Sequence, residues 1–300
     1  MQPPILQHGD KIAIISPSGN IDEQFIDGAV KVLESWGLKP VISQYAKGKY
    51  GRFAGTKEER TADLQWALDS NEIKAVLCSR GGYGVVQIID DIDFTHFDLH
   101  PKWVIGFSDI TVLHLATAAY DIASLHGIMA KDICDQGESA ESLHQCLFGE
   151  PVHYVVPSHP LNRKGKTRGE LIGGNLSVMC GMRGTHLDVT AAGKILFIED
   201  IGEEPYKVDR YLYNLKLGGI LEQLSGLIVG QFTEYEEDEE MCATLYELIA
   251  DAVSEYEYPV CFGFPAGHVK RNLSLPFGID AKLIVTAEGA ELNFEMDSNK

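Results

Sequence analysis

The chain of 300 residues is long enough for one large domain or two of ordinary size, and its 45% hydrophobic and 23% charged residues are typical of a soluble globular protein. No apolar run approaches the ~20 residues of a membrane-spanning helix, and the first ten residues lack the pattern of a signal peptide. A net charge of −19 disfavours binding to nucleic-acid phosphates, which requires clustered lysine and arginine. We therefore expect no membrane and no nucleic acid as partner.

Strand-like and helix-like segments alternate through the first half of the chain. Short apolar runs predict buried parallel strands at 11–16, 38–44, 73–78 and 102–107. Helical patterns fall between and after them, at 22–36, 56–68 and 110–120; Thr56 and Glu59 have the spacing of a capping box at the start of the second. Because parallel strands need crossover connections, this alternation predicts a doubly wound parallel α/β sheet.

The second half of the chain has a mixed pattern of strands and helices. Residues 151–167 hold several prolines and little helical periodicity, so we expect a linker there, between a domain at 1–150 and a mixed β/α domain at 168–300. Within the second domain we expect a strand, two helices and a closing hairpin, at 195–198, 205–218, 241–254 and 281–296.

Two groups of residues receive structural interpretations. Residues 234–240 hold six acids in seven positions; we interpret them as a solvated loop before a helix rather than as a cation or partner site. The six cysteines contain no Cys-x-x-Cys pair, which argues against a zinc or redox site and fits reduced thiols in a cytoplasmic compartment. We expect no metal and no cofactor.

A possible nucleophile lies in the segment Gly106-Phe107-Ser108-Asp109, between a strand and a helix. A sharp strand-to-helix turn projects a serine hydroxyl above a sheet, and the N–H of the following residue faces an incoming oxyanion. Ile110 replaces the last glycine of the Gly-x-Ser-x-Gly pattern. The alternative is that Ser108 only caps the helix.

Glycines and charged residues in three other loops complete the candidate chemistry. The loop after the third strand, Ser79-Arg80-Gly81-Gly82-Tyr83-Gly84, allows close backbone approach to a ligand or merely a turn with positive φ. Glu199 and Asp200 follow an apolar strand, and His268 lies in a loop rich in glycine and proline. Each could be an ordinary loop residue, but together with Ser108 they provide the nucleophile, acid and base of a serine hydrolase.

Six segments, in order over nearly the whole chain, resemble the LD-carboxypeptidase family of serine peptidases, which includes the microcin-immunity hydrolases. They are 79–84, 106–109, 125–127, 172–176, 197–200 and 267–268. The resemblance implies a doubly wound N-terminal domain that carries the nucleophile and a mixed C-terminal domain that carries the acid and the histidine, with the site between them. Ile128 stands where the family pattern leads us to expect proline.

The resemblance also assigns roles to individual residues. Ser108 matches the nucleophile, Glu199 the triad acid and His268 the general base, while the backbone N–H groups of Asp109 and of the Gly81-Gly82 turn match the oxyanion hole. The expected activity is a serine carboxypeptidase of peptidoglycan recycling, which removes the terminal D-alanine from cytoplasmic cell-wall tetrapeptides through an acyl-enzyme. We expect a homodimer, and we expect the peptide or muropeptide substrate to be bound by Arg80, Asn175 and Arg271.

Two alternatives remain at the level of sequence. One is a microcin-immunity-type hydrolase of aminoacyl-nucleotide amides, which would need an aromatic platform for the base; Trp36, Trp66 and Trp103 all fall in or beside regular segments. The other is a non-catalytic ligand-binding protein on the same scaffold, which an intact Ser108, Glu199 and His268 disfavours.

Overall fold

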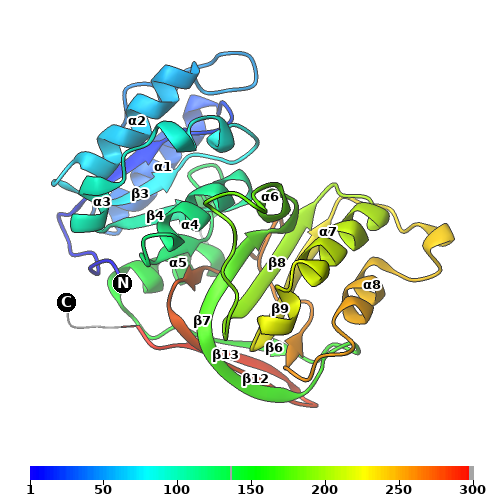
Figure 1. The fold of residues 1–300 in the computed structure, drawn as a ribbon. Coiled ribbons are helices and arrows are strands. Elements are labelled where there is room, and N and C mark those ends of the chain that lie inside the picture. Colours follow the sequence, from blue (N-terminus) through cyan, green and yellow to red (C-terminus); the bar gives the residue numbers. More distant parts are fainter. Residues whose placement is uncertain (136, 297–300) are drawn as a thin grey trace. The chain divides into compact units, whose positions relative to one another are not determined.

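The computed structural model describes residues 1–135 and 137–296, which divide into two compact units (Figure 1). The first unit consists of Met1–Pro151 together with the returning segment Leu273–Gly278. The second consists of Val152–Asn272 together with Ile279–Glu295. Each unit is built around its own sheet.

The sheet of the first unit has the strand order β11-β5-β4-β3-β1-β2, and β1 to β5 are parallel. The chain runs from β1 outward to β2 and then returns to the other side of β1 for β3, so the direction of winding reverses between β1 and β3. In such sheets ligands bind beyond the strand ends at this reversal. The predicted doubly wound parallel sheet is confirmed. Its strands are β1 (Lys11–Ile15), β2 (Lys39–Ile42), β3 (Ile73–Cys78), β4 (Trp103–Gly106), β5 (Ser124–His126) and antiparallel β11 (Leu275–Phe277).

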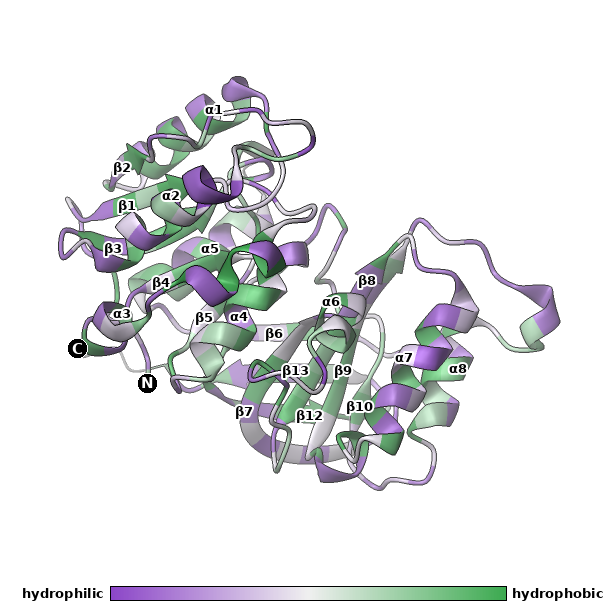
Figure 2. Cartoon of the chain, turned by 45° about the horizontal axis from the view of Figure 1, so that its top comes forward, coloured by the Kyte–Doolittle hydropathy of each residue, from purple (hydrophilic) through white to green (hydrophobic). Residues whose placement is uncertain are grey.

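Helices α1, α2 and α4 of the first unit begin and end near the expected residues, whereas α3 and α5 were not predicted. The capping box at the start of α2 is confirmed, because Thr56 Oγ1 accepts from the Glu59 N–H at 3.3 Å and Glu59 Oε2 accepts from the Thr56 N–H at 2.8 Å. The central strands are buried, and Figure 2 shows hydrophobic residues along them. The helices are α1 (Glu23–Ser35), α2 (Lys57–Asp69), α3 (Thr95–Leu99), α4 (Thr111–Ala118) and α5 (Glu138–Phe148).

The second unit has a mixed sheet of strand order β10-β9-β8-β7-β12-β13-β6. The strands from β10 to β7 are parallel and those from β7 to β6 are antiparallel, so the long strand β7 belongs to both parts and curves between them (Figure 1). Its elements are β6 (His153–Pro157), β7 (Gly165–Asn175), α6 (Leu176–Gly181), β8 (Ile195–Ile201), α7 (Pro205–Leu217), β9 (Gly226–Thr233), α8 (Leu245–Ala252), β10 (Val260–Cys261), β12 (Asp280–Val285) and β13 (Gly289–Phe294).

The second half of the chain differs from the sequence expectation in three places. The expected linker at 151–167 contains β6 and the start of β7, because alternate residues of β6 are buried in the sheet. Residues 273–278 return to the first unit, where β11 pairs with β5. Helix α8 begins at Leu245 rather than at 241, because Thr244 and Glu247 form its capping box. The expected hairpin at 281–296 is confirmed by the pairing of β12 with β13.

The capping box of α2 gives a stability prediction. Thr56→Ala removes the oxygen that accepts from the Glu59 N–H, and it should lower the free energy of unfolding by about 1 kcal/mol. Thr56→Ser keeps that oxygen and should stay near wild type. Thermal or denaturant unfolding of the three proteins checks this, and equal stability of the alanine variant and wild type would contradict it.

Candidate active site

Ser108 lies at the sharp turn between β4 and α4. It opens a short 3₁₀ turn, Ser108–Ile110, directly before the helix. Its φ of +66° lies in the left-handed region that non-glycine residues rarely adopt. Strained backbone of this kind is concentrated at functional sites, and the same strand-turn-helix arrangement exposes the nucleophile in other hydrolases. Ser108, a half-buried residue, therefore has the setting of a nucleophile as well as that of a helix start.

The backbone of Gly81 lies directly against Ser108. A Cβ at position 81 would stand 2.8 Å from Ser108 Cβ and 2.9 Å from Ser108 Oγ, so only glycine fits. The next residue, Gly82, has φ +117°, which L side chains rarely adopt. The first unit thus brings the predicted oxyanion-hole segment Gly81-Gly82 and the buried Asp109 together around Ser108.

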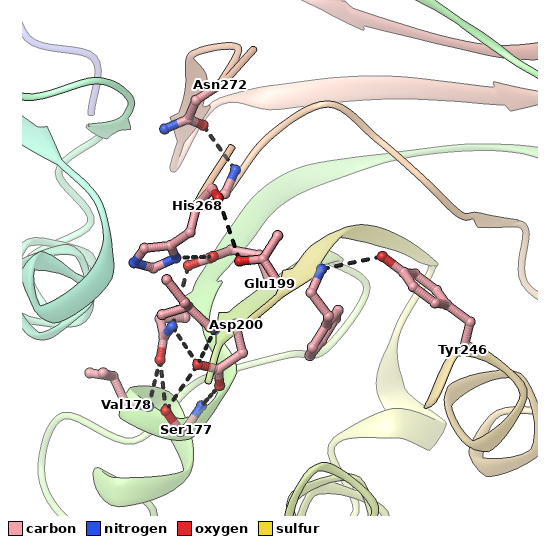
Figure 3. A network of polar contacts seen from close by, with 12 residues as sticks. Ser177, Val178, Glu199, Asp200, Tyr246, His268 and Asn272 are labelled. Atoms are coloured by element: carbon pink, nitrogen blue, oxygen red, sulfur yellow. Dashed lines mark hydrogen bonds and ion pairs between the residues drawn. The ribbon is translucent and has the colours of Figure 1, made fainter. Parts of the chain in front are cut away.

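In the second unit a buried carboxylate holds a histidine (Figure 3). Glu199 Oε2 and His268 Nδ1 are 2.7 Å apart; the glutamate side chain is fully buried and the imidazole is 14% exposed. A carboxylate on Nδ1 favours the tautomer in which Nδ1 carries the proton and Nε2 is the basic nitrogen. The family resemblance assigns the role of triad acid to Glu199 and not to its neighbour Asp200, and the structure places Glu199 in contact with His268.

The loop that carries His268 is hydrogen-bonded to β9, the strand next to that of Glu199. The register of β8 with β9 shifts by one residue, from Ile198 opposite Val229 to Asp200 opposite Phe232. At this shift Gln231 donates from its backbone N–H to the Ala266 carbonyl at 3.0 Å and from Nε2 to the Phe264 carbonyl at 3.1 Å. This role of Gln231 cannot be predicted from the sequence, because a register shift leaves no local pattern.

Gly267 allows the histidine loop to lie against the carboxylate. Its φ is +119°, and a Cβ there would stand 2.8 Å from Glu199 Oε2. The Gly267 N–H donates a hydrogen bond to Asn272 Oδ1 at 2.9 Å (Figure 3). A larger residue at position 267 would push Glu199 away from the orientation that His268 requires.

Asn175 and Asp200 form a second set of polar residues beside Glu199. Asn175 caps α6, since its Oδ1 accepts from the Val178 N–H at 3.1 Å. Its Nδ2 donates to Asp200 Oδ1 at 2.8 Å and, at 3.4 Å, to Glu199 Oε1. Asp200 also accepts from the Ser177 N–H at 2.7 Å. Burial, and then the neighbouring charge of Glu199, raise the pKa of Asp200 to about 6.

The three residues expected to bind substrate have different settings. Arg80 is half-buried and donates from Nη1 to the Asn20 carbonyl at 3.0 Å. Asn175 is 3% exposed and contacts the two carboxylates. Arg271 is exposed. Substrate binding by each of them stays a prediction.

Two further findings concern ligands and membranes. Within residues 1–135 and 137–296, no group of three or more histidine, cysteine, aspartate or glutamate side chains is placed to hold a metal ion. In the same part of the chain, no helix combines the length and the apolar character that crossing a bilayer requires.

Comparisons with known proteins match each half of the chain to a family domain. Residues 12–127 match the model of the LD-carboxypeptidase N-terminal domain, and residues 168–283 match that of the C-terminal domain. The chain therefore belongs to the LD-carboxypeptidase family, and it is a serine carboxypeptidase.

Three similar proteins illustrate this membership. The "Probable murein peptide carboxypeptidase" of Bacillus subtilis (strain 168) is 36% identical over 94% of this chain and 91% of its own. The crystal structure of muramoyltetrapeptide carboxypeptidase from Oxalobacter formigenes superposes with a TM-score of 0.88 at 29% identity, over 96% of this chain and 100% of its own. The microcin C7 self immunity protein MccF, solved with aspartyl sulfamoyl adenosine, has a TM-score of 0.88 at 20% identity over 100% of both chains. At that identity the likeness concerns the fold.

The raised pKa of Asp200 predicts a pH effect on stability. An aspartate whose folded pKa lies above its ordinary value of 3.8 binds its proton more tightly in the folded protein. Its contribution to stability is therefore fully present below about pH 4 and is lost as the pH rises through about 6. Since Asp200→Asn is neutral throughout, the Tm of wild type relative to this variant should rise as the pH falls from about 7 to about 4.5. A constant difference in Tm over that range would contradict the assignment.

Proposed function

We propose that this serine carboxypeptidase is an LD-carboxypeptidase that removes the terminal D-alanine from the tetrapeptide of peptidoglycan, with Ser108 as nucleophile, His268 as general base and Glu199 as the acid of the triad. The observation that carries the proposal is the 2.7 Å contact between His268 Nδ1 and the fully buried Glu199. The strained turn at Ser108 supports it. The substrate is inferred from the similar proteins, which are named as murein peptide and muramoyltetrapeptide carboxypeptidases.

The first half of the reaction is acylation. Ser108 Oγ attacks the carbonyl carbon of the peptide bond that joins an L-centre to D-alanine, and His268 Nε2 takes the hydroxyl proton. The backbone N–H groups of Asp109 and of the Gly81-Gly82 segment donate to the oxyanion of the tetrahedral intermediate. The carbon–nitrogen bond then breaks, His268 gives its proton to the departing amine, and D-alanine leaves as the shortened peptide remains esterified to Ser108.

The second half is deacylation by water. His268 takes a proton from a water molecule, which attacks the ester carbonyl and forms a second tetrahedral intermediate on the same donors. When the carbon–oxygen bond to Ser108 breaks, His268 returns the proton to Oγ. The products are the tripeptide with a new carboxylate and the regenerated serine.

Glu199 gives the histidine its direction and its charge partner. A neutral imidazole must present a basic nitrogen to Ser108, and the carboxylate on Nδ1 fixes that tautomer. When His268 becomes imidazolium, the carboxylate of Glu199 stabilises the new positive charge at 2.7 Å. Full burial of Glu199 makes this interaction stronger than it would be in water.

The substrate carboxylate and the compartment are part of the proposal. The terminal carboxylate of the tetrapeptide requires a cation, for which we propose Arg80 or Arg271, with Asn175 as a further polar contact. We place the reaction in the cytoplasm. All six cysteines are free thiols, as is usual in a reducing compartment.

One digestion compares the two activities within this family. The purified enzyme is mixed with the muramoyl tetrapeptide and, separately, with aspartyl sulfamoyl adenosine, and the products are identified by mass spectrometry. We expect loss of a single D-alanine from the tetrapeptide. Cleavage of the nucleotide amide with an intact tetrapeptide would replace this proposal by the microcin-immunity-type activity.

Removal of the nucleophile tests the role of Ser108. Ser108→Ala should keep the fold and lower kcat on the order of 10⁴-fold, because no other group can form the ester. Circular dichroism and Tm serve as the controls for folding. Turnover near wild type by the folded variant would exclude Ser108 from the reaction and would leave the site without an acyl-enzyme.

Neutralising the triad acid tests Glu199 against its neighbour. Glu199→Gln should lower kcat roughly 10²–10⁴-fold, because the amide no longer stabilises the imidazolium or selects its tautomer. Asp200→Asn is the matched control, and it should reduce kcat much less, since the carboxylate contacting His268 remains. A larger loss in the Asp200 variant would show that the wrong carboxylate had been assigned.

A further inference from the structure

The side chain of Asp109 connects the nucleophile turn to two neighbouring loops. It is 4% exposed, and its Oδ2 accepts from Ser18 Oγ at 2.6 Å and from the Val85 N–H at 3.0 Å. Ser18 follows β1 and Val85 follows β3, the two strands between which the sheet reverses its winding. The Asp109 carboxylate, next to Ser108, is thus hydrogen-bonded to the loop after β1 and to the loop after β3.

Arg60 binds the same two loops from α2. It is 2% exposed, and its Nη1 donates to the Pro17 carbonyl at 2.9 Å and to the Gly84 carbonyl at 2.8 Å. The peptide between Gly84 and Val85 is therefore held at both ends, by Arg60 on its carbonyl and by Asp109 on its N–H. Pro17 and Ser18 are held in the same way, through a carbonyl and a hydroxyl.

The local backbone is shaped to accept this arrangement. Gly84 has φ +143°, and a Cβ there would stand 2.7 Å from Arg60 Nη1. Burial raises the pKa of Asp109 and lowers the pKa of Arg60, and each group's charge opposes the shift of the other. Buried charges are costly unless they are compensated in this manner. The first unit therefore holds two buried opposite charges that both hydrogen-bond to the loops after β1 and β3. Arg60 also donates to the Gly55 carbonyl and to Gln87 Oε1.

We propose that the Asp109 carboxylate, with Arg60 as its counter-charge, is a positioning residue that holds the Gly81–Val85 loop at the distance from Ser108 that the oxyanion donors require. Asp109 is covalently joined to Ser108 and hydrogen-bonded to Val85. At the other end of that loop, Gly81 lies against Ser108 Oγ. The inference rests on the proposed function, because it takes Gly81 and Gly82 as oxyanion donors, and a displacement of about 1 Å in such a site can cost on the order of 10²-fold in rate.

Asp63 offers a matched control in the same unit. It is 6% exposed, and its Oδ2 accepts from Ser43 Oγ at 2.6 Å and from the Tyr45 N–H at 2.9 Å. The two aspartates are thus similarly buried, and each accepts from one serine hydroxyl and one backbone N–H. The donors to Asp63, however, belong to the loop after β2. If a buried carboxylate of this kind only stabilises the fold, the two positions should respond alike to substitution.

The experiment compares Asp109→Ala, Asp109→Asn and Asp63→Ala with wild type. Steady-state kinetics on the tetrapeptide give kcat and KM, thermal unfolding gives Tm, and hydrogen–deuterium exchange follows the peptides that cover residues 79–88. Asp109→Ala should lower kcat on the order of 10²-fold with KM within about twofold, and should raise deuterium uptake in 79–88. Asp109→Asn retains an accepting oxygen, so it should lie between Asp109→Ala and wild type. Asp63→Ala should lower Tm but keep kcat within about threefold and leave uptake in 79–88 unchanged.

Two results would overturn the inference. One is an equal loss of kcat in Asp109→Ala and Asp63→Ala, and the other is wild-type uptake in 79–88 of Asp109→Ala. If Asp109→Ala does not fold, Asp109→Asn decides by the same measurements. Failure of the proposed function is seen separately, as absence of tetrapeptide cleavage by wild type; hydrogen–deuterium exchange on the free protein still decides whether Asp109 holds the loop.

Discussion

The burial of Glu199 is the constraint around which the second unit is arranged. A carboxylate with no exposed surface is stable only if its charge is compensated by hydrogen-bond donors, and here His268 Nδ1 lies 2.7 Å from Oε2. The loop that carries this imidazole follows β10. It is hydrogen-bonded to Gln231 at the register shift of β9, and it passes Glu199 at Gly267, where no Cβ fits. The same features that remove Glu199 from water therefore also fix the orientation of His268.

In the first unit, strained backbone fixes the position of Ser108. Ser108 has the φ of a left-handed residue, and Gly81 lies so near that a methyl group would collide with the hydroxyl. The positive φ of Ser108 is energetically unfavourable, and the close approach of Gly81 restricts position 81 to glycine. Both features persist because the α/β sheet and the buried Asp109 and Arg60 hold the surrounding loops. Ser108 lies just after β4 and Glu199 lies near the end of β8, where the rigid sheets limit their motion.

Much of the first unit could be predicted from the sequence, because its signals are local. Apolar runs gave the strands, and the spacing of Thr56 and Glu59 gave the start of α2. The second unit was harder, because β6 sits in a proline-containing stretch and residues 273–278 pair with a strand about 150 residues earlier in the chain. Pairing over that separation leaves no periodic pattern in the segment itself.

The site shows the same division. Ser108, Glu199 and His268 could be named from short motifs, and the choice of Glu199 over Asp200 agrees with the contact to His268. The residues that hold these three in place could not be predicted. Their contacts are the two hydrogen bonds of Asp109, the hydrogen bond from Asn175 to Asp200, and the bonds of Gln231 to the His268 loop. Each of these contacts joins residues from separate elements, so no spacing in the sequence predicts it.

The most direct measurement of the central claim is the chemical trapping of the acyl-enzyme. Wild-type enzyme is mixed with excess tetrapeptide, quenched in acid during the first turnover, digested, and mapped by mass spectrometry. The shortened peptide should be found as an ester on the fragment that contains Ser108, together with an equal amount of released D-alanine. Release of D-alanine in that first turnover with an unmodified Ser108 fragment, or an adduct on a different residue, would contradict the serine mechanism.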